Sequence, residues 1–173
     1  MAVMTISVPA CAPDSDASHT AAQVEASLNA GIAALERGDV EFAEGEFDNV
    51  LRLDAFNKYA MYNLGLVAQQ RGEVTESEEW YRRALAIDPR FVSALYNLAV
   101  LRAPVATHEA LDLYEILIEV EPANAAARLN LSFLLRQFGE AVRADEELAL
   151  ALELDPSLAA GAADQPPLLG GVE

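Results

Sequence analysis

Few residues in this sequence have the types and spacings that carry out catalysis or hold a metal ion. The two histidines, His19 and His108, lie far apart, and Cys11 is the only cysteine. The chain therefore has no His-x-x-x-His pair and no cysteine pair, and it has no glycine-rich loop of the kind that binds phosphates. We expect no catalytic residue, no metal site and no cofactor, and we predict that the protein is not an enzyme.

Carboxylates are abundant, but their pattern favours a solvated surface. They gather in short runs, such as Glu76, Glu78 and Glu79, within segments that we expect to be helical. The alternatives are a cation site or an acidic docking surface. The formal net charge is −17, from 28 acidic and 11 basic residues. Nucleic acids and anionic membranes would each require a basic face, so we expect neither as a partner.

The most distinctive polar pattern is a ladder of asparagines, each two residues before a glycine or another small residue. The ladder consists of Asn29, Asn63, Asn97 and Asn130. Asparagine is only a middling helix former, so four in register need an explanation. A neutral amide can both donate and accept hydrogen bonds, which suits it to contact with a peptide backbone.

The segment 58–91 shows which elements must position these side chains. Its apolar residues recur at helical spacing, Gly72 interrupts them, and Asp88 and Pro89 end the pattern. This predicts two short amphipathic helices joined by a glycine turn. Such a hairpin has apolar residues on more than one face, so it needs copies of itself on either side to bury them.

The rest of the chain supplies those copies at intervals of 34 residues, with one interval of 33. A small residue of the second helix recurs as Ala43, Ser77, Ala110 and Ala144. Four residues after each comes a bulky one, in the series Phe47, Tyr81, Tyr114 and Leu148. The predicted units span about 24–57, 58–91, 92–124 and 125–158, within an array from residue 20 to residue 158.

The pattern resembles the tetratricopeptide repeat family, whose units follow W-x2-L-G-x2-Y, then A-x3-F, then P. Unit two carries Leu64-Gly65 and Pro89 at the matching positions, and unit four carries Leu131-Ser132. The resemblance implies an all-α fold, a right-handed superhelical solenoid of four tandem units. Unit three deviates, because one residue is missing and Ala103-Pro104 replaces the turn glycine. Since proline lacks a backbone donor, we expect a distorted turn there.

The resemblance also places the asparagines on the first helices, facing a concave groove. The neighbours expected on the same face as the four asparagines include Tyr59, Tyr62, Leu66, Tyr96, Val100 and Phe133. The basic residues with which some family members clamp acidic tails are absent, and Glu25 is the only charged residue on this face. We therefore predict an adaptor that binds a largely apolar peptide segment, extended or as a short helix. The alternative is that asparagine is common at this family position whether or not anything binds.

The two ends of the chain raise further alternatives. Residues 1–19 are expected to be irregular, with a helix beginning at Thr20, and residues 159–173 to form a flexible tail. The segment Val8-Pro9-Ala10-Cys11 resembles the end of a bacterial lipoprotein signal, in which a small residue precedes the acylated cysteine. Such a signal would make the protein lipid-anchored through Cys11. Otherwise we expect a cytoplasmic protein. A single cysteine cannot form an internal disulfide, so nothing requires an oxidising compartment, and no stretch is long or apolar enough to span a bilayer. A homodimer through the C-terminal unit, or a self-associating scaffold, is the alternative to a peptide-binding adaptor.

Overall fold

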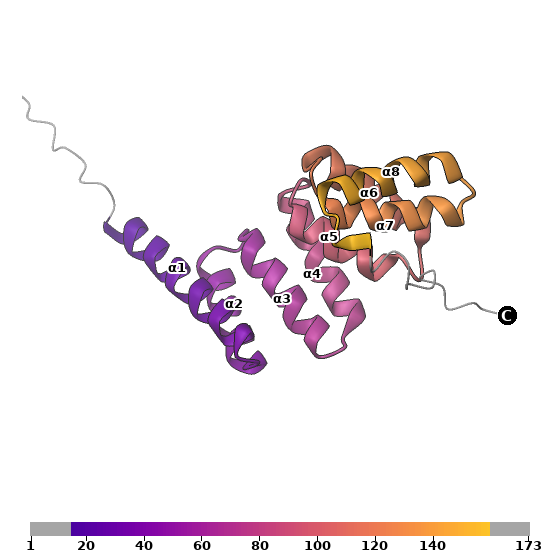
Figure 1. The fold of residues 1–173 in the computed structure, drawn as a ribbon. Helices are drawn as coiled ribbons and strands as arrows, with labels where there is room; N and C mark the ends of the chain where they lie inside the picture. The colour runs from indigo at the N-terminus through magenta and orange to yellow at the C-terminus, as the bar shows by residue number, and fades with distance from the viewer. Residues whose placement is uncertain (1–14, 160–173) are drawn as a thin grey trace, which may run out of the picture. The chain divides into compact units, whose positions relative to one another are not determined.

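The computed structural model describes residues 15–159, and every regular element in this part of the chain is an α-helix (Figure 1). The helices are α1 (Ser15–Glu36), α2 (Val40–Leu53), α3 (Lys58–Gln70), α4 (Val74–Ile87), α5 (Val92–Arg102), α6 (Thr107–Val120), α7 (Ala125–Gln137) and α8 (Ala141–Leu154). Each odd-numbered helix packs against the helix that follows it, which gives four helix pairs. The predicted all-helical repeat fold is confirmed.

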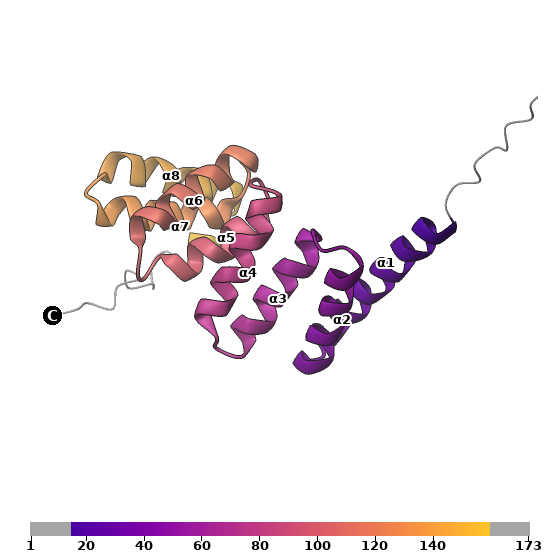
Figure 2. The ribbon, with the colours of Figure 1, turned by 180° about the vertical axis from the view of Figure 1, so that it is seen from behind.

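The helices divide into two compact units, with the division between Ala55 and Phe56. The first unit contains α1 and α2, and the second contains α3 to α8. Within the second unit, α4 also packs against α5 and α6 against α7, so the helix pairs are stacked (Figures 1 and 2). Buried residues of α5, α6 and α7, with Ala144 of α8, form one continuous hydrophobic cluster in this unit.

In the first two pairs the helices approach closely where a glycine of the first helix faces an aromatic ring of the second. A Cβ placed on Gly31 would lie 2.6 Å from the Phe47 ring, and one placed on Gly65 would overlap the Tyr81 ring. Ser77 Oγ, from α4, also donates a hydrogen bond of 2.9 Å to the Gly65 carbonyl oxygen. Because Phe47 and Tyr81 are fully buried, neither ring has room to move aside.

The turns inside the pairs follow the predicted glycine pattern except in the third pair. Gly38, Gly72 and Gly139 have φ values of 77°, 76° and 78°, a left-handed conformation that favours glycine. In the third pair α5 has 11 residues, whereas α3 and α7 have 13 each. It ends at Arg102, and Ala103 remains in a right-handed helical conformation with φ −50°. The missing residue and Pro104 thus shorten the first helix of this pair.

The N-terminal helix starts earlier than the sequence pattern predicts. The helix α1 begins at Ser15, five residues before the expected start at Thr20. Alanines at positions 17, 21 and 22 are strong helix formers, which explains the extension. The predictions that concern Cys11 and the tail beyond Ala159 lie outside the described residues. None of the described helices is both long enough and apolar enough to cross a membrane.

The close contacts predict opposite effects for two Gly→Ala substitutions. Gly65→Ala forces a methyl group into the buried Tyr81 ring, and overpacking of this kind lowers the free energy of unfolding by about 1–3 kcal/mol. Gly45→Ala is the matched control, because a Cβ at this exposed helical position meets no atom within 4 Å. We expect it to raise the free energy by up to about 1 kcal/mol. Urea unfolding measures both, and a neutral Gly65→Ala would contradict the packing argument.

Candidate functional site

The first asparagines of the ladder differ in environment. Asn29 is exposed on α1, in the first compact unit. Asn63 is only 8% exposed, and its Nδ2 donates a hydrogen bond of 2.7 Å to the carbonyl oxygen of Tyr59, one turn earlier in α3. The Asn63 amide nitrogen is therefore satisfied within its own helix.

The other two asparagines join neighbouring helix pairs. Asn97 Nδ2, on α5, donates to the hydroxyl of Tyr62 on α3 at 3.1 Å. Asn130 Nδ2, on α7, donates to the hydroxyls of Tyr96 and Tyr114 at 3.3 and 3.0 Å. The amide nitrogens therefore serve the internal structure of the second compact unit. In these hydrogen bonds Asn130 uses two N–H donors and Asn97 uses one, and neither Oδ1 atom takes part.

Two of the aromatic residues predicted for the groove, Tyr59 and Tyr62, form a connected cluster with Phe91. The ring centroid of Phe91 lies 5.5 Å from that of Tyr59 and 5.4 Å from that of Tyr62, both edge-to-face. Tyr59 is 49% exposed and Val100 is 40% exposed, while Tyr62 is half-buried. The remaining predicted groove residues, Leu66, Tyr96 and Phe133, are also half-buried.

Sequence reasoning missed Phe91, because it considered only the first-helix face. Phe91 precedes α5 as its N-cap residue, so it belongs to the loop that follows α4. The available signal was a large aromatic residue directly after Pro89-Arg90, in a loop where polar residues are common.

This face carries no unpaired charge, because its phenols are neutral and its basic residues all form ion pairs. Burial raises the pKa of Tyr62, although hydrogen bonds with Asn97 and Ser93 act in the opposite direction. Burial likewise raises the pKa of Tyr81 to about 12. Helices α3, α5 and α7 contain no acidic residue. Their four basic residues all form ion pairs, namely Lys58 with Asp88, Arg102 with Glu78 and Glu109, Arg128 with Glu147, and Arg136 with Asp145.

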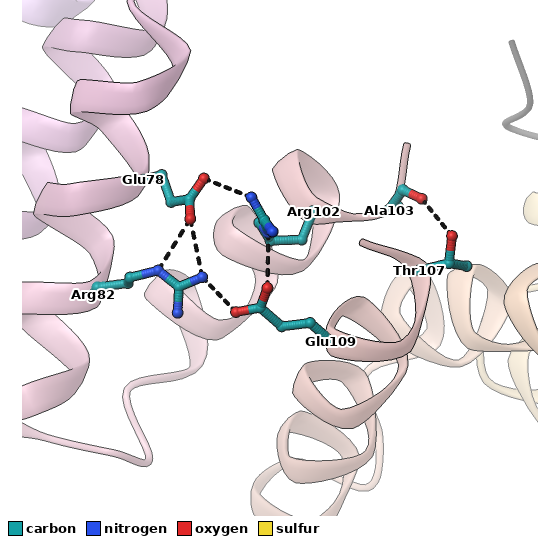
Figure 3. Close-up of polar contacts among 6 residues, drawn as sticks. All are labelled: Glu78, Arg82, Arg102, Ala103, Thr107 and Glu109. Carbon is teal, nitrogen blue, oxygen red and sulfur yellow. Dashed lines mark hydrogen bonds and ion pairs between the residues drawn. The ribbon is translucent and has the colours of Figure 1, made fainter. Parts of the chain in front are cut away.

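Four charged residues form a closed ring beside the shortened third pair (Figure 3). Arg82 pairs with Glu78 at 2.9 Å and with Glu109, while Arg102 pairs with Glu78 at 2.9 Å and with Glu109 at 2.8 Å. Partial burial acts to raise the pKa of Glu109, but hydrogen bonds from the two arginines lower it below its usual value. The ring connects α4, α5 and α6.

The sequence analysis did not predict this ring of ion pairs, although the sequence contains a signal for it. In the repeat register Arg102 corresponds to Ala68 and Leu135, which are 2% and 0% exposed. A charged residue at a position that is otherwise buried and apolar indicates a local ion pair. Near the same turn, Thr107 Oγ1 donates a hydrogen bond of 3.2 Å to the Ala103 carbonyl oxygen (Figure 3).

Comparison with known proteins places a family match in part of the chain. Residues 28–91 match the family model described as tetratricopeptide repeat. No curated protein sequence matches the chain significantly. The family match places tetratricopeptide repeats in residues 28–91. The helix pairs of the other described residues and the solved structures described next show that the chain has the fold of a tetratricopeptide repeat solenoid. Proteins of this family are in general non-catalytic adaptors for protein interactions.

Several solved structures share the fold. The PilF protein of Pseudomonas aeruginosa is similar over 84% of this chain and 68% of its own, with 26% identity and a TM-score of 0.73. MamA of Desulfovibrio magneticus is similar over 78% of this chain and 76% of its own, with 21% identity and a TM-score of 0.65. An O-GlcNAc transferase mutant of Thermobaculum terrenum is similar over 67% of this chain but only 22% of its own, with 28% identity and a TM-score of 0.61.

The hydrogen bonds of the ladder predict that its members differ in structural importance. Asn130→Ala removes the partner of the Tyr114 hydroxyl, and this tyrosine is 1% exposed. We expect the free energy of unfolding to fall by about 1–3 kcal/mol, because a buried polar group is left unsatisfied. Asn29→Ala, at the exposed equivalent position, is the control and should change it by less than about 0.5 kcal/mol. Equal effects in urea unfolding would contradict a structural role for the ladder.

Proposed function

We propose that the protein is a non-catalytic adaptor whose α3, α5 and α7 helices bind a largely apolar peptide segment. The observation that carries this proposal is the partly exposed aromatic and aliphatic face on these helices. Tyr59, Tyr62 and Tyr96 offer large rings with polar tips, and Val100 adds an exposed aliphatic side chain. Tyrosines suit such a face because they lose little conformational entropy on binding.

The hydrogen bonding of this face supports recognition of a peptide through its main-chain N–H groups. Since the Asn97 and Asn130 amide nitrogens are already engaged with tyrosine hydroxyls, these side chains offer acceptors to a ligand. A peptide in extended conformation presents backbone N–H donors at regular intervals, which such acceptors can satisfy. The basic residues of these helices are all paired, so apolar contact area would contribute most of the affinity.

A charge placed on this face tests the proposal. Peptides are selected from a phage-displayed library of apolar 12-residue sequences against the full chain, and the affinity of the best is measured by fluorescence polarisation. We expect Val100→Glu to weaken binding at least about tenfold, because the carboxylate must lose water against apolar side chains.

The matched control for that experiment is Val74→Glu. Val74 is 54% exposed and lies at the start of α4, a second helix, so the same substitution there should leave the affinity unchanged. A library that yields no binder, or two variants that bind equally well, would contradict the proposed face.

A second candidate function is self-association through the last helix pair. On α8, Val142 is 74% exposed, Leu150 41% and Leu154 45%, which leaves apolar surface beyond the final repeat. Repeat arrays usually cover such a surface with a polar capping element. A second copy of the chain would bury it in a homodimer and would make the protein a scaffold.

Light scattering across a range of concentrations distinguishes this candidate from the first. The homodimer predicts a molecular mass that rises with concentration towards twice 18.6 kDa. Leu150→Asp should keep the protein monomeric, because a buried unpaired carboxylate opposes association. A wild-type mass that remains monomeric at all concentrations would exclude the homodimer.

A further inference from the structure

The only lysine of the chain lies in a setting that resembles a receptor for cations. Lys58 Nζ is 2.5 Å from Asp88 Oδ2, 5.1 Å from the ring centroid of Tyr59 and 5.0 Å from that of Phe91. One carboxylate and two aromatic rings therefore surround a single positive charge. We call Tyr59, Asp88 and Phe91 the cation cage.

The cage is held in place by contacts that do not involve Lys58. Asp88 Oδ1 accepts a hydrogen bond of 3.0 Å from the backbone N–H of Arg90, which orients the carboxylate. The rings of Tyr59 and Phe91 contact each other edge-to-face at 5.5 Å. Phe91 also contacts Tyr62 at 5.4 Å, so the cage continues into the aromatic face of the proposed groove.

Solvent reaches the contact between Lys58 and the cation cage. Its side chain is 25% exposed, that of Asp88 is 33% exposed, and Tyr59 is 49% exposed. Ion pairs that solvent reaches contribute little to stability, so exchange of one cation for another has a small cost. The net charge of −17 also favours the approach of a positively charged partner.

We propose that the cation cage is a subsite for an arginine side chain of the bound peptide, and that Lys58 occupies it in the free protein. A guanidinium is planar, donates two parallel hydrogen bonds to a carboxylate and stacks on aromatic rings. It therefore matches the cage better than an ammonium group does. The biological role of this subsite rests on the proposed groove function, which it deepens by adding one basic side chain to the apolar segment.

The last helix pair provides a matched position without the aromatic rings. In the repeat register, Asp155 corresponds to Asp88, while Ala125 and Leu158 correspond to Lys58 and Phe91. Asp155 Oδ1 accepts hydrogen bonds from Ser157 N and Ser157 Oγ at 3.0 and 2.6 Å. Asp155→Asn therefore removes one negative charge from an equivalent turn and leaves the cage intact.

The experiment titrates the full chain with acetyl-arginine methylamide and follows the ring resonances of Tyr59 and Phe91 by NMR. Acetyl-citrulline methylamide, which has the same shape without the charge, is the control ligand. We expect saturable shifts with the arginine compound alone. Lys58→Met should tighten binding at least about fivefold, because the internal competitor is removed. Asp88→Asn should abolish the shifts, and Asp155→Asn should leave them unchanged.

Three results would overturn the proposal: equal shifts with both ligands, binding that survives Asp88→Asn, or no gain from Lys58→Met. If Lys58→Met does not fold, the comparison of wild type with Asp88→Asn still decides between binding and its absence. These outcomes are separate from the groove test, because the small ligands do not require the apolar face. Arginine binding without apolar peptide binding would contradict the proposed groove and support the cation cage. Apolar peptide binding without arginine binding would support the groove and contradict the cage.

Discussion

The close approach of a first-helix glycine to a second-helix ring is the contact on which the rest of the second compact unit depends. Gly65 admits the Tyr81 ring, and Ser77 fixes the same level of α3 by its hydrogen bond to the Gly65 carbonyl oxygen. The buried Tyr81 ring then lies 5.7 Å from that of Tyr62. Since Tyr62 accepts the hydrogen bond of Asn97, the packing inside one helix pair positions the groups that join it to the next.

The fold was predictable because its signals are local. The helix α3 begins at Lys58, where the predicted unit begins, and α4 ends at Ile87, directly before the Asp88-Pro89 stop. The site was less predictable, because its geometry joins residues of different units. Nothing in the spacing of Asn130 reveals that its amide donates to two hydroxyls, and Phe91 acquires its place only when the loop after α4 folds back towards α3. Ligand binding at the predicted groove residues stays a prediction.

Ion pairs between second helices recur in register with their charges exchanged. Arg82 on α4 pairs with Glu109 on α6, and at the equivalent positions Glu115 on α6 pairs with Arg143 on α8. Complementary charges are thus available at both junctions within the second compact unit.

The separation of charge between the two sets of helices has a consequence for recognition. The second helices carry most of the negative charge, and their field attracts cations from a distance with little selectivity. Helices α3, α5 and α7 carry paired basic residues, neutral phenols and amides, so the proposed peptide recognition would depend on shape and hydrogen bonding. At the edge of this neutral face, the Lys58 ammonium lies beside the Asp88 carboxylate and over the rings of Tyr59 and Phe91, so one carboxylate and two rings act together on one cation. In the proposed arginine subsite, this general attraction would become a specific contact, because aromatic faces favour a weakly hydrated, planar cation over a strongly hydrated one.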